Sequence, residues 1–225
     1  MTFSIIARCA RTGQFGMAVA SSSPAVASRC AFARAGVGVV ATQNVTDPRL
    51  GPKALALLES GASARECRDI MMRTAAFSAF RQVMILDASG RSAYWAGERI
   101  LGRYGQASAE DVAAAGNMLA DEQIPQAMVT SFSASSPEFE LGERLLLAME
   151  AGLAAGGEEG PVHSAGLLIV EAQSWPLTDL RVDWSETPLA ALRGLWLLWQ
   201  PQMRDYVTRG LDPTTAPSYG VPGDS

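Results

Sequence analysis

The chain has 225 residues, 48% of them hydrophobic and 18% charged, with a formal net charge of −5. This composition is typical of a well-packed globular protein and excludes a disordered chain. The acidic balance, without any basic run, argues against a nucleic-acid partner, and the longest strongly apolar stretch, GLWLLW, is too short to span a bilayer. We therefore expect neither nucleic acid nor a membrane as a partner.

The length fits one domain, which we place at residues 1–210, followed by a loosely ordered tail at 211–225. Cys9, Cys30 and Cys67 show no C-x-x-C spacing, and the N-terminus lacks the features of a signal peptide, so we expect reduced thiols in a cytoplasmic protein. With one histidine and no H-E-x-x-H motif, the sequence offers no zinc ligand set. We predict no metal and no cofactor.

The first half of the chain predicts strands and then helices. The predicted elements are a strand at 2–11, a hairpin connection at 12–16, a returning strand at 16–23, a helix or loop at 24–34, a strand at 37–44, a helix between Pro52 and Gly61, a helix at 63–75 and a hairpin at 81–98. Ser63 is predicted to cap the 63–75 helix, with Glu66 three residues later.

The second half predicts two helices, two strands and a last helix. Helical spacing covers 117–133 and 138–154, a glycine-rich loop follows at 155–164, strands are predicted at 165–173 and 177–184, and a helix at 188–209 is interrupted by Pro201. Strands joined by hairpins, with helices in blocks, predict an α+β domain in which helices cover antiparallel sheets.

Thr2 is the first candidate catalytic residue. A threonine hydroxyl is a weak nucleophile and needs a base. If Met1 is removed, the new α-amine lies on the same residue as the hydroxyl, and its ordinary pKa of about 7.7–8.0 suits a base near neutral pH. The alternative is that threonine is simply a common second residue.

Polar residues end the next two strands. The hairpin at 12–16 makes its two strands antiparallel, so the serine run at 21–23 should lie beside Thr2. The run Thr42-Gln43-Asn44 ends the strand at 37–44. The alternative interpretation of both runs is an ordinary polar strand end.

Other motifs have weaker functional interpretations. AGVGVVA at 35–41 contains G-x-G-x-x-A, but a strand follows it, which favours glycines that allow close backbone approach over a dinucleotide site. His163 adjoins Ser164 without a G-x-S-x-G motif, so a serine–histidine hydrolase ranks low. Gly116-Asn117 offers either a helix N-cap at Asn117 or amide donors for an oxyanion.

The helix at 188–209 is apolar on nearly all sides. Its residues include Leu192, Leu195, Trp196 and Trp199. Such a helix is either core or, in part, a subunit interface, and we expect a homodimer through it.

Several stretches taken together resemble one family. MTFSIIAR, GMAVASSS, ARAGVGVVATQN with GPKALALLESG, RQVMILDASGR, AGNML, LGERLLLAMEAGLAAGG and WPLTDLRVD resemble, in this order, the DUF1028 family, which is placed with the N-terminal nucleophile (Ntn) hydrolases. The resemblance covers roughly residues 2–199. It implies a four-layer αββα sandwich with two antiparallel sheets between helical layers, Thr2 as the N-terminal nucleophile, and hydrolysis of an amide bond.

The opening also resembles the proteasome-type catalytic chain, with departures. Ser22 stands near the place of an aspartate, and Arg29 or Arg34 near the place of a lysine. Arginine does not deprotonate, so it could supply only positive charge. The acidic pair Glu158-Glu159 replaces a more basic stretch of the family, which could change a family ligand site.

The leading hypothesis is therefore an N-terminal-threonine amidohydrolase for a small-molecule substrate. Thr2 would attack, and Ser22 or Ser23 would orient its amine. Donors near Asn117 or near Thr42-Gln43 would hold the oxyanion. We assign Arg34, Thr42 and Gln43 to substrate binding. The alternative hypothesis is a catalytically inactive binding or assembly protein of the same fold.

Overall fold

The computed structural model describes residues 1–221 and contains two antiparallel sheets. Sheet A has the strand order β10-β9-β2-β1-β8-β7, and sheet B has the order β3-β4-β5-β6. The strands of sheet A are β1 Thr2–Arg8, β2 Phe15–Ser21, β7 Tyr104–Ala109, β8 Val112–Asn117, β9 Ser164–Val170 and β10 Thr178–Val182. Those of sheet B are β3 Ala31–Arg34, β4 Gly38–Asn44, β5 Arg81–Asp87 and β6 Ser92–Ala96.

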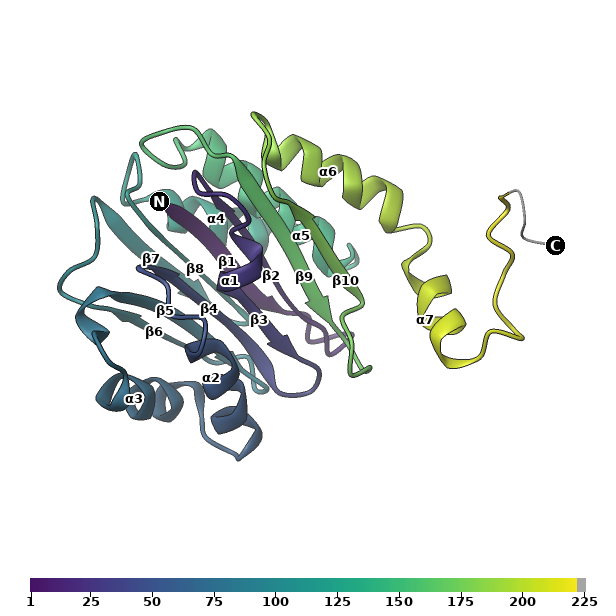
Figure 1. The fold of residues 1–225 in the computed structure, drawn as a ribbon, viewed down its shortest axis with the longest axis horizontal. Coiled ribbons are helices and arrows are strands. Elements are labelled where there is room, and N and C mark those ends of the chain that lie inside the picture. The colour runs from purple at the N-terminus through teal and green to yellow at the C-terminus, as the bar shows by residue number, and fades with distance from the viewer. Residues whose placement is uncertain (222–225) are drawn as a thin grey trace.

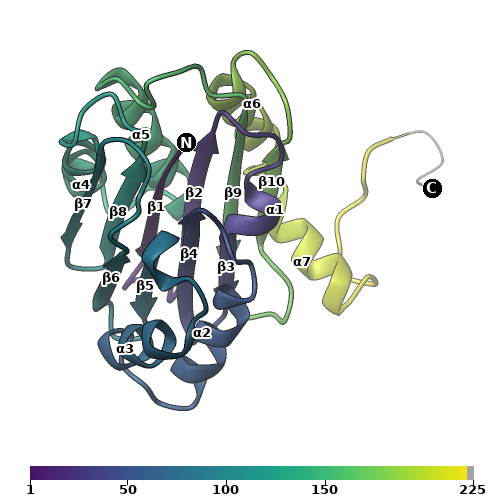
Figure 2. The same ribbon diagram turned by 60° about the vertical axis from the view of Figure 1, so that its left-hand side comes forward.

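Helices cover the outer faces of both sheets (Figures 1 and 2). The α-helices are α1 Ala27–Cys30, α2 Leu50–Glu59, α3 Ala64–Thr74, α4 Ile124–Ala134, α5 Leu141–Ala154, α6 Pro188–Trp199 and α7 Met203–Leu211, with a short 3₁₀ turn at Ser78–Phe80. Helices α4, α5 and α6 pack on sheet A, and α2 and α3 pack on sheet B. The predicted four-layer sandwich, with two antiparallel sheets between helical layers, is confirmed.

Alternation along β1 shows how the layers are built. Phe3 and Ile5 belong to the apolar cluster between sheet A and helices α4 to α6, whereas Ile6 belongs to the cluster between the two sheets. Because successive strand residues point to opposite faces, Thr2 shares the face of Ile6 and points toward sheet B. Full burial of each large apolar side chain stabilises the fold by roughly 1.5–3 kcal/mol.

Two local predictions are confirmed. Ser63 caps α3, since its side chain accepts a hydrogen bond from the Glu66 backbone N–H while the Glu66 carboxylate accepts one from the Ser63 backbone. Gly38 allows close backbone approach, because a Cβ atom there would overlap the carbonyl oxygen of Leu86. In the AGVGVVA stretch, Gly38 therefore serves strand packing, whereas Gly36 has a positive φ of 71° in the turn between β3 and β4.

Three strands were missed by the sequence patterns. The segment at 24–34 contains β3 after the short α1, and β7 and β8 occupy residues 104–117. The N-cap role of Asn117 is wrong, because Asn117 ends β8 and the next helix begins at Ile124. The run VAAAGN of β8 is buried throughout, so it carries no alternating pattern of polar and apolar residues.

Helix α6, which we expected to form a subunit interface, has one buried face and one exposed face. Leu192 and Trp196 are fully buried in the chain's own core, whereas Leu197 and Leu198 are 61% and 70% exposed. A homodimer through this exposed face of α6 stays a prediction.

Within residues 1–221, no helix is both long and apolar enough to cross a membrane. The domain boundary at residue 210 also stays a prediction, and residues 222–225 of the expected tail lie outside the described residues.

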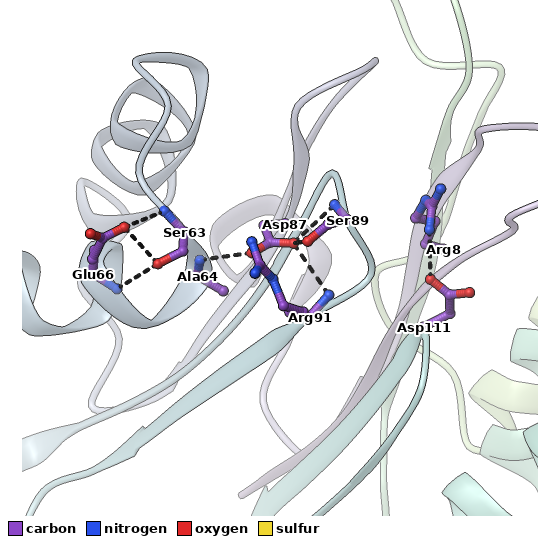
Figure 3. Close-up of polar contacts among 8 residues, drawn as sticks. All are labelled: Arg8, Ser63, Ala64, Glu66, Asp87, Ser89, Arg91 and Asp111. Carbon is purple, nitrogen blue, oxygen red and sulfur yellow. Dashed lines mark hydrogen bonds and ion pairs between the residues drawn. The ribbon is translucent and has the colours of Figure 1, made fainter.

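Asp87 pairs with Gly38, at the end of β4 opposite Gln43, and organises that end of sheet B (Figure 3). Its buried carboxylate accepts hydrogen bonds from the Ser89 hydroxyl and from the backbone N–H groups of Ala64, Ser89 and Arg91. Burial alone raises the pKa of Asp87, but these hydrogen bonds outweigh burial and hold the pKa below its ordinary value. The charged carboxylate thus ties the β5–β6 turn to the start of α3.

We expect Asp87→Asn to lower the free energy of unfolding by about 1–3 kcal/mol at neutral pH, because it removes charge-assisted hydrogen bonds from a buried site. A pKa below the ordinary 3.8 means that this stabilisation is present above that pH and is lost as the pH falls through the folded-state value. Urea denaturation of both proteins along a descending pH series measures it. Asp69→Asn, at an exposed ion pair, is the control and should change little.

Candidate active site

Thr2 begins β1 at one end of sheet A, where the N-terminus lies in Figures 1 and 2. It pairs directly with Asn117 of β8, and the β1–β2 register places Ser21 on its other side. All three side chains are buried. Side chains directly opposite each other in an antiparallel pair have Cβ atoms about 4.5–5.5 Å apart, so Thr2 and Asn117 are neighbours on the face toward sheet B.

A chain of hydroxyl groups leads from Arg29 to Thr2. The Arg29 guanidinium donates to Ser23 Oγ at 2.5 Å, Ser23 Oγ lies 2.8 Å from Ser21 Oγ, and Thr2 Oγ1 lies 3.4 Å from Ser21 Oγ. Ser21 Oγ and Thr2 Oγ1 both donate to the carbonyl oxygen of Met1. The two hydroxyls therefore converge on one carbonyl oxygen.

The direction of this chain follows from arginine, which has donors only. Ser23 Oγ accepts from Arg29, so its own proton is free for Ser21 Oγ, and the Ser21 proton is free for the carbonyl oxygen. A donor chain that starts at a cation polarises each following hydroxyl. Ser21 is thus a strengthened donor, aimed at a carbonyl oxygen beside Thr2.

A second network crosses between the two sheets below Thr2. Ser4 Oγ donates to Gln43 Oε1 at 2.6 Å, Gln43 Nε2 donates to Gln82 Oε1 at 2.8 Å, and Asn117 Nδ2 donates to the same Gln82 oxygen at 2.9 Å. Gln82 Nε2 donates to the hydroxyl of Tyr94 at 2.9 Å. The network joins β1 and β8 of sheet A to β4, β5 and β6 of sheet B.

This network fixes the orientation of the Asn117 amide. Gln43 Nε2 and Gln82 Nε2 also donate to the backbone carbonyls of Ala115 and Gly116, at 3.2 and 3.0 Å, and a carbonyl only accepts. The Gln82 side-chain oxygen must therefore face Asn117, and the Asn117 side-chain nitrogen must donate to it. The remaining Asn117 Oδ1 is buried without a hydrogen-bond partner among the described residues. The free group of Asn117 at this site is therefore an acceptor.

Glu158 is the acidic group of the site. It lies in the loop between α5 and β9, forms an isolated bridge with Leu119 just after β8, and its Oε2 accepts from the Ser22 backbone N–H at 3.2 Å. Its Oε1 is buried and has no hydrogen-bond partner among residues 1–221. Burial raises the pKa of Glu158 to about 7, while the Met1 α-ammonium and hydrogen bonds from Ser22 lower it in part.

The raised pKa of Glu158 predicts how stability changes with pH. Between the ordinary value of 4.5 and about 7, the folded chain retains a proton that the unfolded chain has released. This contribution is fully present below 4.5 and is lost as the pH rises through about 7.

Glu158→Gln mimics the protonated group, so we expect it to be more stable than the wild type by about 2–3 kcal/mol at alkaline pH and nearly equal at acidic pH. Urea denaturation along an ascending pH series checks this. Glu159→Gln is the matched control, because Glu159 is exposed and pairs with Arg103. A wild type whose stability relative to Glu158→Gln does not change with pH would contradict the assignment.

The structure brings some predicted residues to Thr2 and leaves others away from it. Ser23 joins the hydroxyl chain, Ser22 contacts Glu158 and not Thr2, and Gln43 and Asn117 belong to the inter-sheet network. Thr42 shares the face of β4 with Val40, which packs toward α2 and α3, so it points away from sheet A.

Arg34 lies at the far end of sheet B. It pairs with Gly38, whereas Gln43 is five residues further along β4, about 17 Å at the usual rise of a strand. Its guanidinium forms an ion pair with Glu59. The positions of Arg34 and Thr42 therefore give no contact with the site at Thr2.

His163 and Ser164 are not a catalytic pair. Ser164 Oγ donates to the Ser23 carbonyl at 2.6 Å and accepts from the Val26 backbone N–H. The His163 ring stacks on Trp184 at 4.3 Å between centroids, and its buried Nδ1 has no hydrogen-bond partner in the part of the chain described. The serine–histidine hydrolase hypothesis has no supporting geometry.

A hollow of about 820 Å³ opens at the end of the sheets opposite Thr2, lined by residues that include Glu59, Glu66, Asp69 and Asp87. These four carboxylates are held by Arg34, Ser63, Arg68 and the β5–β6 turn, respectively. A hollow whose carboxylates already have ion-pair or hydrogen-bond partners offers less to catalysis than the unpartnered acceptors beside Thr2, so we place the candidate site at Thr2.

Three residues of the site were missed or left unassigned by the sequence. Ser21 belongs to the serine run, and the β1–β2 hairpin could have singled it out, because Ser21 follows directly from the register opposite Thr2. Glu158 was noted only as an acidic departure. Gln82 gave no signal, since a glutamine within a buried strand is a common packing residue.

The comparisons with known proteins agree with this fold. The model of a family described as "Family of unknown function (DUF1028)" matches residues 2–192. The crystal structure of protein SPO2555 from Silicibacter pomeroyi, assigned to the same family, is similar with a TM-score of 0.81 and 28% identity, covering 88% of this chain and 89% of that chain.

Anbu (ancestral beta-subunit) from Yersinia bercovieri is also similar, with a TM-score of 0.41 and 12% identity over 91% of this chain and 97% of that chain. A TM-score this low establishes neither a shared fold nor a shared activity. No curated protein matches the sequence.

Proposed function

The chain belongs to the DUF1028 family, whose function is unknown, and we propose that it is an N-terminal nucleophile hydrolase that cleaves an amide bond of a small molecule once Met1 has been removed. Thr2 supplies both the nucleophile and the base. The family match supports the fold, and the residues around Thr2 support the chemistry.

The observation that carries this proposal is the unpartnered Asn117 Oδ1. Its nitrogen donates to Gln82, and Asn117 pairs with Thr2 at the start of β1, so we infer that the free oxygen is available to Thr2. A buried acceptor without a partner is unfavourable by roughly 1–3 kcal/mol. Removal of Met1 creates an α-amine on Thr2 that can donate to this oxygen, which would satisfy Asn117 and hold the base beside Thr2 Oγ1.

The reaction then follows the chemistry of an amine-assisted hydroxyl. Thr2 Oγ1 attacks the substrate carbonyl carbon while its proton moves to the α-amine. The oxyanion accepts a hydrogen bond from Ser21, the ammonium returns the proton to the leaving nitrogen, and the C–N bond breaks to leave an ester on Thr2. Water, deprotonated by the same amine, cleaves the ester to release the carboxylic acid and restore Thr2.

Arg29 takes an electrostatic role in this scheme. Its charge acts on the oxyanion through Ser23 and Ser21, in the direction already set by the hydrogen-bond chain. Preorganised donors of this kind are worth about 10²–10³ in rate when one is removed. Arginine cannot be the base, so the proton passes only through the Thr2 amine.

Covalent labelling tests the proposed nucleophile. The untagged protein is treated with an electrophilic β-lactone, which an activated hydroxyl opens to an ester, and the adduct is mapped by peptide mass spectrometry. We expect the adduct on Thr2, none on the internal Thr42 and Thr46, and none in Thr2→Ala or in a chain extended before Thr2. Equal labelling of the wild type and Thr2→Ala would contradict the assignment of Thr2 as the nucleophile.

A further inference from the structure

Met1 occupies a defined position that becomes vacant when it is removed. Its carbonyl oxygen accepts hydrogen bonds from Thr2 Oγ1 and Ser21 Oγ. Its side chain lies over Gly160, where an added Cβ would be 3.4 Å from the Met1 methyl carbon and 3.9 Å from its sulfur. Its α-ammonium is close enough to Glu158 to act on that carboxylate. Met1 is thus hydrogen-bonded at its carbonyl, its side chain packs over Gly160, and its amine acts on Glu158 through charge.

This position overlaps with that of a substrate acyl group. The nitrogen and Oγ1 of Thr2 are attached to adjacent carbon atoms, so an acyl group on either atom fills nearly the same space. Met1 is an acyl group on the nitrogen. In the proposed function, the substrate acyl group is carried on Oγ1, with its carbonyl oxygen at the Ser21 hydroxyl.

The environment of Glu158 indicates the charge that the substrate acyl group carries. Its side chain is 5% exposed, and one of its two oxygens has no hydrogen-bond partner among the described residues. A buried carboxylate with a free oxygen is stabilised by a cation. No lysine or arginine is in an ion pair with it among residues 1–221, and the Met1 α-ammonium is the cation that acts on it.

We propose that the substrate is an α-aminoacyl amide, whose free α-ammonium is bound by Glu158 and whose side chain lies over Gly160. This inference rests on the proposed function, because it assumes that Thr2 attacks the carbonyl next to the amine. It narrows the substrate to amides of unblocked amino acids. Glu158 is then a specificity residue and Gly160 the floor of the side-chain site.

The test uses three p-nitroanilides that share one leaving group: L-methionine p-nitroanilide, its N-acetyl derivative, and 4-(methylthio)butanoic p-nitroanilide, which lacks the amine. The untagged protein is expected to hydrolyse the first with kcat/KM at least about tenfold above the others. Glu158→Gln should lower kcat/KM for the first compound by about the same factor, so that the preference over the amine-free compound disappears. The exposed Glu159→Gln is the control.

Equal hydrolysis of the amine-free compound, or an equal loss on all three compounds in Glu158→Gln, would overturn the inference and assign Glu158 to the Thr2 amine instead. Binding provides a readout without turnover. L-Methioninamide is titrated into Thr2→Ala protein lacking Met1, followed by NMR, with and without Glu158→Gln.

Binding that requires Glu158 and the ligand amine, without hydrolysis of any anilide by the wild type, would support the ligand class and contradict the hydrolase. A protein that is labelled at Thr2 and hydrolyses anilides, but binds methioninamide and 4-(methylthio)butanamide equally well, would support the hydrolase and contradict the ligand class. The two proposals therefore fail separately.

Discussion

Thr2→Ala is expected to lower the rate of amide hydrolysis by on the order of 10³-fold or more, because it removes the nucleophile and leaves only the oxyanion donors. Thr2→Ser keeps both the hydroxyl and the α-amine, so it should retain most of the activity. Initial rates on L-methionine p-nitroanilide measure both changes. Circular dichroism and thermal unfolding should show that Thr2→Ala folds normally, since the lost hydroxyl and methyl are small.

Two results would contradict the assignment of Thr2. One is wild-type turnover in Thr2→Ala. The other is equal loss in Thr2→Ala and Thr2→Ser, which would indicate a packing role. Thr12→Ala is a suitable control, because Thr12 lies in the β1–β2 turn at the other end of these strands.

Gln82→Leu is expected to have the second largest effect, on both stability and activity. Gln82 hydrogen-bonds Gln43, Tyr94, Asn117 and the Gly116 carbonyl, and all of these groups except Tyr94 are fully or nearly fully buried. Each buried group left without a partner costs about 1–3 kcal/mol, so we expect the free energy of unfolding to fall by about 3 kcal/mol or more. Urea denaturation measures this loss.

The same substitution releases the Asn117 amide. An Asn117 that can rotate no longer holds its oxygen toward the Thr2 amine, and misplacement of this kind can cost about 10²-fold in rate. Loss of the acceptor also disfavours the charged ammonium and lowers the pKa of the amine, so the acidic limb of the kcat/KM profile should move to lower pH. A purely structural role would lower stability without moving this limb.

Gln14→Leu is the matched control for Gln82→Leu. Gln14 is also buried, but it donates to Glu171 at the opposite end of the strands. We expect Gln14→Leu to lower stability while leaving the pH profile in place. A shift of the profile in both variants would show that the change reflects general loosening of the fold.

The order of strands and helices was largely predictable from local patterns. The β1–β2 hairpin, the β5–β6 hairpin and the Ser63–Glu66 capping box each depend on residues close in sequence. Strands β7 and β8 were not predictable, because their small residues, Ala, Gly and Ser, show no β-branched enrichment and β8 is buried on both faces.

The candidate site was predictable only in part. The hairpin register was enough to bring the serine run to Thr2. Residues 82, 117 and 158 come from β5, β8 and a loop, and only the stacking of the sheets brings them together. Arg34 and Thr42 illustrate the opposite case, since strand direction carries one away from Thr2 and side-chain alternation turns the other outward.

The intact mass of the protein, produced with its own N-terminus and no tag, tests the central claim most directly. The account predicts a mass short by one methionine, which leaves Thr2 with a free amine as base. A mass that includes Met1 would contradict it, because the Thr2 nitrogen would then be a non-basic amide and Met1 would keep the acyl position filled. In that case we would assign the protein to the alternative hypothesis, a non-catalytic binding protein of the same fold.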